Sequence, residues 1–99
     1  MAKVILRQEA INDLNDIWFY TFDEWSEKQA DKYYNLLLDS CQELANSKIV
    51  GKHFPEIDKE IFGFRIGQHI IFYRVIQKGT LEIERILHVQ MDLKNRITE

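Results

Sequence analysis

Six side chains in the second half of the chain are of the types that could cleave RNA without a metal ion. They are Arg65, His69, Tyr73, Arg74, Arg85 and His88. Such cleavage needs an acid or base that titrates near neutral pH and cations that stabilise the charged phosphate in the transition state. The residue types therefore allow a ribonuclease site, provided that the fold brings these side chains together.

A structural interpretation of the same residues is simpler. Successive side chains of a strand point to opposite faces of a sheet, so Tyr73 and Arg74 cannot both line one site. We expect Tyr73 to lie in the core and Arg65 and Arg74 to be solvated strand positions. The chain also carries 13 basic against 16 acidic residues, whereas nucleic-acid binders usually present a basic face. We predict no catalytic residues and no direct binding of nucleic acid.

Metal and carboxylate chemistry have little support in the sequence. A zinc site needs about four converging ligands, but the three histidines are scattered over predicted loop and strands. No glycine-rich phosphate loop, GxSxG or HExxH motif occurs. Because nothing places them in an apolar cleft that would raise a pKa, four carboxylates are interpreted as solvated helix positions: Asp13, Asp16, Glu24 and Glu27. We expect no metal and no cofactor.

Length and composition indicate one globular domain over residues 1–99, with 45% hydrophobic and 29% charged residues. The only cysteine, Cys41, lies in an apolar helical stretch and is expected to be a small buried side chain. Residues 1–10 carry charges and lack the apolar region of a signal peptide. No apolar run reaches the roughly 18–20 residues that span a bilayer. We therefore expect a cytoplasmic protein.

The first half of the chain has the periodicity of two helices. Apolar residues recur at i, i+4, i+7, i+8 and i+11, which predicts a helix over residues 9–23. Ser26 and Gln29 have the spacing of a capping box, so a second helix begins there and its apolar positions continue to Ala45. The short turn between the two helices favours an antiparallel hairpin, with Trp25 placed to pack at its corner.

Strand-like patterns occupy most of the remaining chain. The predicted strands cover residues 3–6, 62–66, 70–76 and 81–88, and residues 46–60 are a predicted loop. The 70–76 segment is β-branched or aromatic almost throughout and should be a central strand covered on both faces. In the last strand the apolar alternation changes phase at Arg85, which predicts a β-bulge. Since an unpaired buried charge is costly, its guanidinium should pair with a carboxylate or backbone carbonyls.

This order of elements predicts an α+β domain of two layers. It has an N-terminal strand, an antiparallel helical hairpin, a three-stranded antiparallel meander and a short C-terminal helix within residues 91–99. Helices packed on one face of a mostly antiparallel sheet are a stable solution for such a chain.

Four segments carry a more specific signal. Residues 10–20 read AxxDLxxIxxY, residues 51–57 read GxxxPEI, residues 67–75 read GQHIIFYRV and residues 83–92 read IERILHVQMD. In this order they resemble the ParE toxins of the RelE/ParE toxin–antitoxin superfamily, whose strand motifs are GRHVIFYRV and IxRVLHxxMD. One departure is Gln68, where the family often has Arg.

The resemblance implies a RelE-like fold and a type II toxin–antitoxin module of the plasmid-stabilisation type. It also implies neutralisation by a ParD-like antitoxin and non-catalytic inhibition of DNA gyrase. We expect the antitoxin to fold across the helical hairpin with Trp18, Phe22 and Tyr34 as aromatic anchors. The expected target-binding residues lie on the last strands and the tail: Arg74, Arg85, His88, Met91, Asp92, Lys94 and Arg96.

Two other functions stay open. RelE-type relatives are ribosome-dependent mRNA endonucleases. The resemblance implies that this activity depends on a cluster of Arg and Lys with a Tyr near the C-terminus. The corresponding strand positions here hold Ile70, Val89 and Gln90, and no tyrosine follows Tyr73. The second is a non-toxic remnant of the family that acts as an interaction module. For the tail, the alternative to target binding is a structural role: Met91 caps the core, and Asp92 caps a final helical turn.

Overall fold

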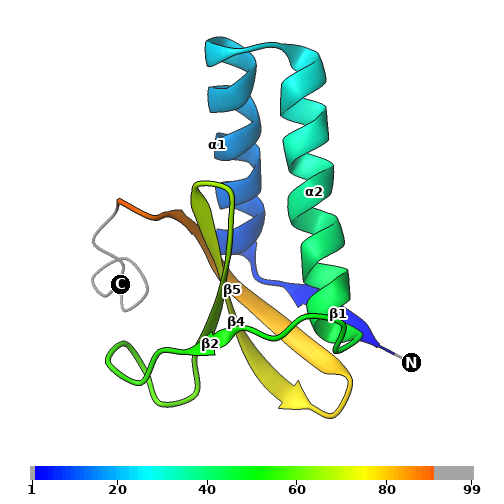
Figure 1. The fold of residues 1–99 in the computed structure, drawn as a ribbon, viewed down its shortest axis with the longest axis vertical. Helices are drawn as coiled ribbons and strands as arrows, with labels where there is room; N and C mark the ends of the chain where they lie inside the picture. The colour runs from blue at the N-terminus through cyan, green and yellow to red at the C-terminus, as the bar shows by residue number, and fades with distance from the viewer. Residues whose placement is uncertain (1, 91–99) are drawn as a thin grey trace.

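Two helices and a five-stranded sheet make up residues 2–90, the part of the chain that this computed structural model describes (Figure 1). The elements are β1 (Lys3–Leu6), α1 (Gln8–Glu24), α2 (Glu27–Ala45), β2 (Lys52–His53), β3 (Phe62–Ile66), β4 (His69–Gln77) and β5 (Thr80–His88). The strands lie in the order β1-β5-β4-β3-β2, with β1 parallel to β5 and the other pairs antiparallel. The predicted helical hairpin and meander are therefore confirmed. The helix expected within residues 91–99 lies outside the described residues.

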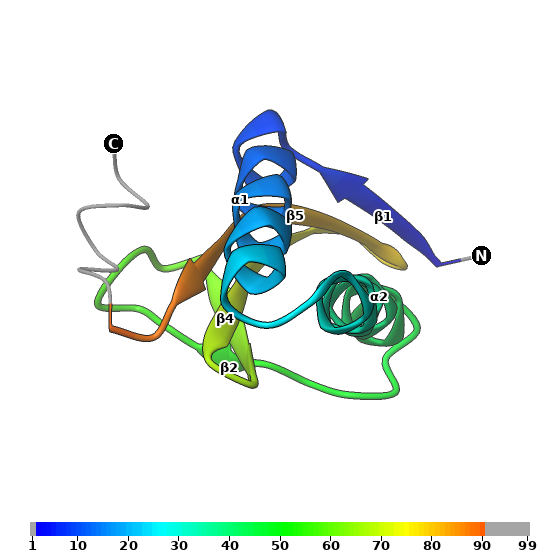
Figure 2. The same ribbon diagram turned by 90° about the horizontal axis from the view of Figure 1, so that it is seen from above.

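Each of the two helices begins within one residue of its predicted start. Ser26 is the N-cap of α2, and its hydroxyl accepts a hydrogen bond from the Gln29 backbone N–H at 3.1 Å. The helices run side by side and extend beyond the end of the sheet (Figures 1 and 2). Trp25, at their connection, is 74% exposed, so the expectation that it packs at the corner is wrong. The indole borders an open pocket and is not enclosed by the core.

Apolar residues cover both faces of the sheet. On one face, Ile71 and Tyr73 of β4 pack in a cluster with residues of α1 and α2. On the other face, Ile70 and Phe72 pack with residues of the segment between β2 and β3, including Phe54. The first half of β4 is thus covered on both faces, as predicted. Its last residues before Gln77, Val75 and Ile76, are about half exposed, because neither the helices nor that segment covers them.

The predicted β-bulge lies in β5. Phe72 is opposite Arg85, whereas the next residue of β4, Tyr73, is opposite Ile83. Glu84 is therefore the extra residue of the bulged strand. The bulge keeps Ile83 and Ile86 in the helix-facing cluster although they are three residues apart.

The segment after α2 contains a short strand that the sequence did not predict. Lys52–His53 pairs with Phe62 and Gly63 and extends the sheet by two residues. Just before it, the backbone N–H of Gly51 donates a hydrogen bond to the Tyr73 hydroxyl at 2.9 Å. A Cβ atom at residue 51 would lie 2.5 Å from that hydroxyl and 2.9 Å from the carbonyl oxygen of Gly63. Only glycine lets the chain approach the sheet this closely.

The first prediction tests this contact. Gly51→Ala should lower the free energy of unfolding by about 1–3 kcal/mol, because Tyr73 or the backbone must shift to accommodate the methyl group. Urea unfolding followed by circular dichroism measures it. The matched control is Val50→Ala: Val50 is 79% exposed, and its loss should change stability by less than about 0.5 kcal/mol. Equal stabilities for the two variants would contradict the close approach.

Candidate functional site

The residues expected to anchor a partner lie on the helical hairpin, where two of them touch. The rings of Trp18 and Phe22 stack at a centroid distance of 5.3 Å and an interplanar angle of 15°. Trp18 Nε1 donates a hydrogen bond to Asp31 Oδ1 of α2 at 2.9 Å, which fixes the indole across the hairpin. Phe22 is 44% exposed, whereas Tyr34 is partly buried against the core. Trp18 and Phe22 therefore offer one aromatic surface.

Three more aromatic residues of the hairpin are exposed, and none of them was among the expected partner anchors. Phe19, Tyr20 and Trp25 are 63%, 66% and 74% exposed, and Phe19 packs edge-on against Trp18. The signal was available in the helical pattern. Phe19 and Tyr20 fall outside the apolar stripe that faces the core, so their rings have no place in the interior. Phe19 extends the surface formed by Trp18 and Phe22, whereas Tyr20 and Trp25 line a pocket on another side of the hairpin. Exposed apolar groups of this kind point to binding sites.

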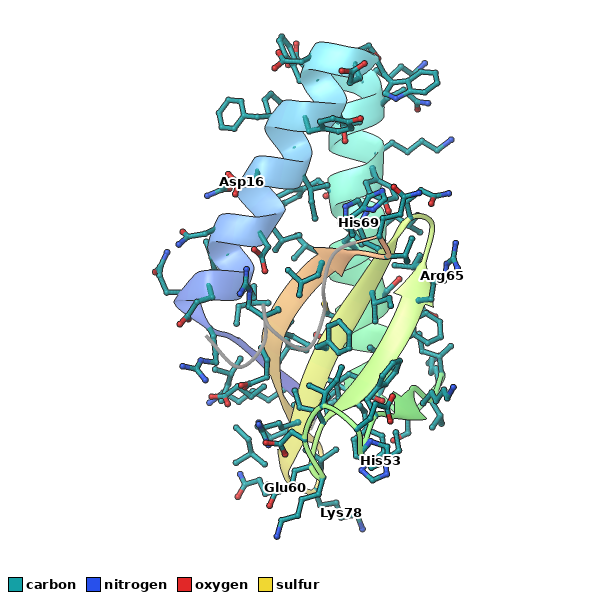
Figure 3. The ribbon with its side chains drawn as sticks, turned by 90° about the vertical axis from the view of Figure 1, so that its left-hand side faces the viewer. Asp16, His53, Glu60, Arg65, His69 and Lys78 are labelled. Carbon is teal, nitrogen blue, oxygen red and sulfur yellow. The ribbon has the colours of Figure 1, made fainter. Side chains whose placement is uncertain are left out.

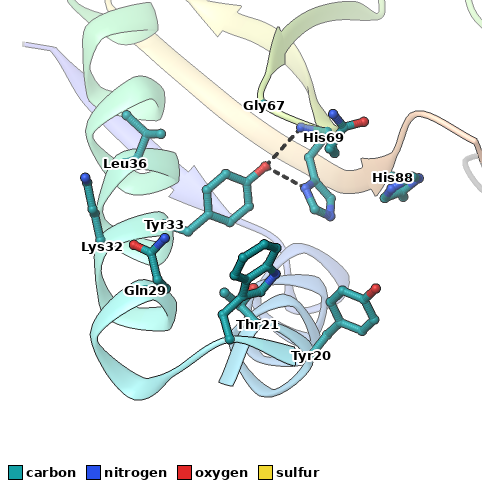
Figure 4. A pocket seen from close by; sticks show the side chains of 11 residues that line it. Tyr20, Thr21, Gln29, Lys32, Tyr33, Leu36, Gly67, His69 and His88 are labelled. Atoms are coloured by element: carbon teal, nitrogen blue, oxygen red, sulfur yellow. Dashed lines mark hydrogen bonds between the residues drawn. The ribbon is translucent and has the colours of Figure 1, made fainter. Parts of the chain in front are cut away.

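A pocket of about 480 Å³ opens beneath the hairpin tip, between the helices, the β3–β4 turn and the end of β5 (Figure 4). Tyr20, Trp25, Tyr33 and Leu36 form its aromatic and aliphatic walls, and His69 and His88 lie on the sheet side. Its volume lies in the range of ordinary ligand sites. The pocket is thus lined by both helices and by the strand that ends in the IERILH motif.

The Tyr33 hydroxyl ties the second helix to the turn at the bottom of this pocket. It lies 2.7 Å from His69 Nδ1, donates to the Ile66 carbonyl at 3.2 Å and accepts from the Gln68 backbone N–H at 3.3 Å (Figure 4). Burial raises the pKa of Tyr33. Gly67 adopts a φ of 58°, and a Cβ there would come within 2.7 Å of the hydroxyl. A glycine is therefore required both by the turn and by the tyrosine.

His69 and His88 face each other across neighbouring strands. They are directly paired in the β4–β5 register, and their ring centroids are 5.4 Å apart. Burial, followed by the nearby charge of His88, lowers the pKa of His69 to about 4, against a smaller opposing effect of Asp13. His69 is therefore neutral at pH 7 and supplies no positive charge to a phosphate.

Arg74 is held by three carboxylates and is not the solvated strand position that was expected. Its guanidinium lies 3.1 Å from Asp58, 3.7 Å from Glu60 and 3.5 Å from Glu84, and the side chain is 27% exposed. The hydrogen bond with Asp58 is the main cause that raises the pKa of Arg74. The structural reason is the segment between β2 and β3, which brings two acids over β4.

Arg85 has the carboxylate partner that was predicted, and that partner is Asp13. Arg85 Nε donates to Asp13 Oδ2 at 2.8 Å and Nη2 donates to Oδ1 at 3.0 Å. The Ile86 backbone N–H also donates to Oδ2, at 3.0 Å. The Asp13 side chain is only 11% exposed, so its interpretation as a solvated helix position is wrong. Asp13 lies beside the apolar stripe of α1, and its side chain is largely covered because the bulge of β5 turns Arg85 towards that helix.

The six candidate residues for RNA cleavage do not converge. The Tyr73 hydroxyl is occupied by the Gly51 N–H in the core, as expected for a core residue. Arg65 is exposed on β3, as expected, and donates to the Gly67 carbonyl (Figure 3). Of the set, only His69 and His88 lie side by side. The expected target-binding residues of the tail, Met91, Asp92, Lys94 and Arg96, lie outside the described residues.

Among residues 2–90, no three or more His, Cys, Asp or Glu side chains cluster in a way that could hold a metal ion. His53 and His69 lie at opposite ends of the sheet (Figure 3). Cys41 is buried, and burial raises the pKa of its thiol to about 12. Neither of the described helices is long and apolar enough to cross a membrane.

The fold is shared with solved toxin–antitoxin structures. A chain of the chromosomal ParDE toxin–antitoxin system of P. aeruginosa matches with a TM-score of 0.75 and 18% identity, over 91% of this chain and 98% of that chain. A chain of the RelBE2 toxin–antitoxin complex of Mycobacterium tuberculosis matches with a TM-score of 0.66 and 19% identity, over 88% and 96%. These likenesses define the fold class as RelE-like, as the sequence motifs implied.

Sequence comparison gives the family. The profile of the ParE toxin of the type II toxin–antitoxin system, parDE, matches residues 4–93. Toxin ParE1 of Mycobacterium tuberculosis is 30% identical over 96 residues, 97% of this chain and 98% of the relative. Toxin ParE1 of Caulobacter vibrioides is 30% identical over 94 residues, 95% and 96%. The chain therefore belongs to the ParE toxin family and is the toxin component of a ParDE-type toxin–antitoxin system.

The second prediction concerns His69. Its pKa in the folded protein, about 4, lies below the ordinary value of about 6.5. The unfolded chain therefore binds more protons between these values, and stability falls as the pH drops from about 6.5 to about 4, by at most about 1.4 kcal/mol per pH unit. NMR titration of the His69 ring should show a midpoint near 4. Tyr33→Phe should keep it low because burial is the main cause, whereas a wild-type midpoint near 6.5 would contradict the burial.

Proposed function

We propose that this toxin arrests growth by binding DNA gyrase, without catalysing a reaction. The observation that favours binding over catalysis is that the two arginines on β4 and β5 are both paired with carboxylates. Arg74 is paired with Asp58, Glu60 and Glu84, and Arg85 with Asp13. A ribonuclease needs cations directed at the phosphate, and each of these arginines is already held by protein carboxylates.

Charge balance supports the same choice. The chain has a net charge of −3. Moving Arg85 from Asp13, whose side chain is only 11% exposed, to a phosphate would leave that carboxylate unpaired at a cost of several kcal/mol. Inhibition by binding needs no cation directed at a reacting phosphate and no acid with a tuned pKa. It needs a surface that recognises the target. Gyrase acts on chromosomal DNA, so this proposal also places the protein in the cytoplasm.

The surface for the antitoxin lies, in this proposal, on the helical hairpin. A ParD-like antitoxin would cover the stacked Trp18 and Phe22 rings and Tyr34, and would bury more than roughly 1,200 Å² in total. Support comes from the exposure of Phe22, 44%, and from the fixed position of Trp18 on Asp31. Rigid aromatic rings are the usual anchors of such interfaces because they bury area at little entropic cost.

The third prediction tests these anchors. The double variant Trp18→Ala/Phe22→Ala should weaken antitoxin binding by about 30-fold or more, which corresponds to about 2 kcal/mol. Isothermal titration calorimetry measures the dissociation constant, and circular dichroism checks that the variant is folded. Val50→Ala, an exposed apolar residue outside the hairpin, is the control and should bind normally. A structure of the complex with Trp18, Phe22 and Tyr34 solvent-exposed would rule out the assignment.

The fourth prediction tests the target. Removal of residues 94–99 should abolish inhibition of gyrase supercoiling while leaving folding and antitoxin binding intact. The reason is that Lys94 and Arg96 are cationic groups in a polar tail, available to a charged partner surface. If the shortened protein still blocks supercoiling, the tail is not the effector. If the full-length protein cleaves ribosome-bound mRNA and leaves supercoiling untouched, the ribonuclease alternative is correct. Absence of any growth arrest would identify a non-toxic member of the family.

A further inference from the structure

We infer that Asp13 is a positioning residue for target binding: it holds the end of β5 in the place from which the toxin engages its target. The inference rests on the proposed function, in which His88 and the following residues contact gyrase. The hydrogen bonds of Asp13 go to Arg85, itself one of the expected target-binding residues, and to the backbone of Ile86, two residues before His88. Asp13 acts through the backbone of Ile86 and the side chain of Arg85.

The edge of the sheet explains why such a residue is needed. β1 pairs with β5 only as far as Leu6 opposite Ile83, and the Arg7 N–H donates to the Ile83 carbonyl at 3.1 Å. On this edge of β5, no strand among the described residues continues after that point, whereas β4 accompanies the other edge as far as His88. The Ile86 N–H on this open edge donates to Asp13 Oδ2 instead. A carboxylate on α1 thus takes the place of a missing strand, and its charge strengthens the hydrogen bond.

The bulge changes the direction of β5, and Asp13 contacts the strand just after it. With Glu84 inserted, β5 bends. After the bend, β4 holds one edge of the strand as far as His88, and the Val89 N–H donates to the Gln68 carbonyl at 2.9 Å, while Asp13 holds the other edge. Asp13 holds Arg85 through two parallel hydrogen bonds and Ile86 through a third. Two residues further on, His88 ends the strand in contact with His69 and lines the pocket. The chain leaves the sheet there towards the tail that the proposal assigns to the target.

The antitoxin surface lies elsewhere on the same helix. Trp18 follows Asp13 by five residues, which is about 140° around α1 at 3.6 residues per turn. Trp18 is held by Asp31 of α2, with no contribution from Arg85 or Ile86. A change at Asp13 should therefore separate the two functions, weakening toxicity and leaving the antitoxin site intact. A residue needed only for folding would affect both together.

The experiment compares three full-length variants: Asp13→Ala, Asp13→Asn and Cys41→Ala. Asp13→Asn keeps an oxygen that can accept from the Ile86 N–H but loses the charge. Cys41→Ala removes buried volume from α2 and serves as the control for lost stability alone. Each is measured for growth arrest on induction without antitoxin, for inhibition of gyrase supercoiling, for antitoxin affinity and for hydrogen exchange at the Ile86 amide, at a temperature where all are folded.

We expect Asp13→Ala to lose growth arrest at normal protein levels and to need about tenfold more protein for half-inhibition of gyrase, as loss of a charge-assisted hydrogen bond implies. Its antitoxin affinity should stay within about twofold of wild type, and its Ile86 amide should exchange faster. Asp13→Asn should recover part of both the protection and the toxicity. Cys41→Ala should remain toxic.

Opposite results separate the inference from the proposed function. If Asp13→Ala arrests growth like wild type, or if its toxicity and its antitoxin affinity fall together, the inference is wrong whatever the target. If growth arrest depends on Asp13 while gyrase is unaffected by the wild-type protein, the inference stands and the proposed target is wrong. A wild-type protein without toxicity overturns both.

Discussion

The pairing of Asp13 with Arg85 is the contact on which the arrangement of the two layers depends. It joins α1 to β5 across 72 residues of sequence, at the point where β1 no longer accompanies the strand. Removing two charges from water costs several kcal/mol, and only good geometry with further hydrogen bonds offsets it. Here the carboxylate accepts three N–H groups, two from the guanidinium and one from the Ile86 backbone. The helix thus closes a sheet edge that would otherwise expose backbone groups.

The same bulge places a second charged group inside the protein, and this group explains Arg74. Glu84 is 8% exposed, and among the described residues its Oε2 has no hydrogen-bond partner. Burial, followed by the neighbouring Glu82, raises the pKa of Glu84. Arg7, at 3.1 Å, and Arg74, at 3.5 Å, share its other oxygen and offset that cost. Arg74 therefore has a structural use in the free toxin, which sequence similarity alone cannot distinguish from a role in binding the target.

Local patterns in the sequence were sufficient for much of this fold. The periodicity of the helices, the Ser26 cap and the change of phase at Arg85 are each determined by residues close together in the chain, and each has its expected place. The errors concern distant contacts. Asp13 and Arg74 were interpreted as solvated because their partners lie in other elements, and Trp25 was expected to pack at the corner but borders an open pocket. The strand Lys52–His53 pairs only through two residues, too few for an alternation to be visible.

The pocket lies between the tip of the helical hairpin and the end of β5, which the proposal assigns to the target. Tyr20 and Trp25 reach it from the hairpin tip, and His88 reaches it from the last residue of β5. An antitoxin on Trp18 and Phe22 reaches His88 only if its chain also continues into this pocket, which those two residues do not line. In that case, on the proposed sites, the antitoxin would neutralise the toxin by covering His88. No coupling through the core is required, in contrast to an allosteric inhibitor, which must bind two conformations with different affinity. The pocket at the end of β5 is therefore the place where, on the proposed sites, an antitoxin would compete with the target.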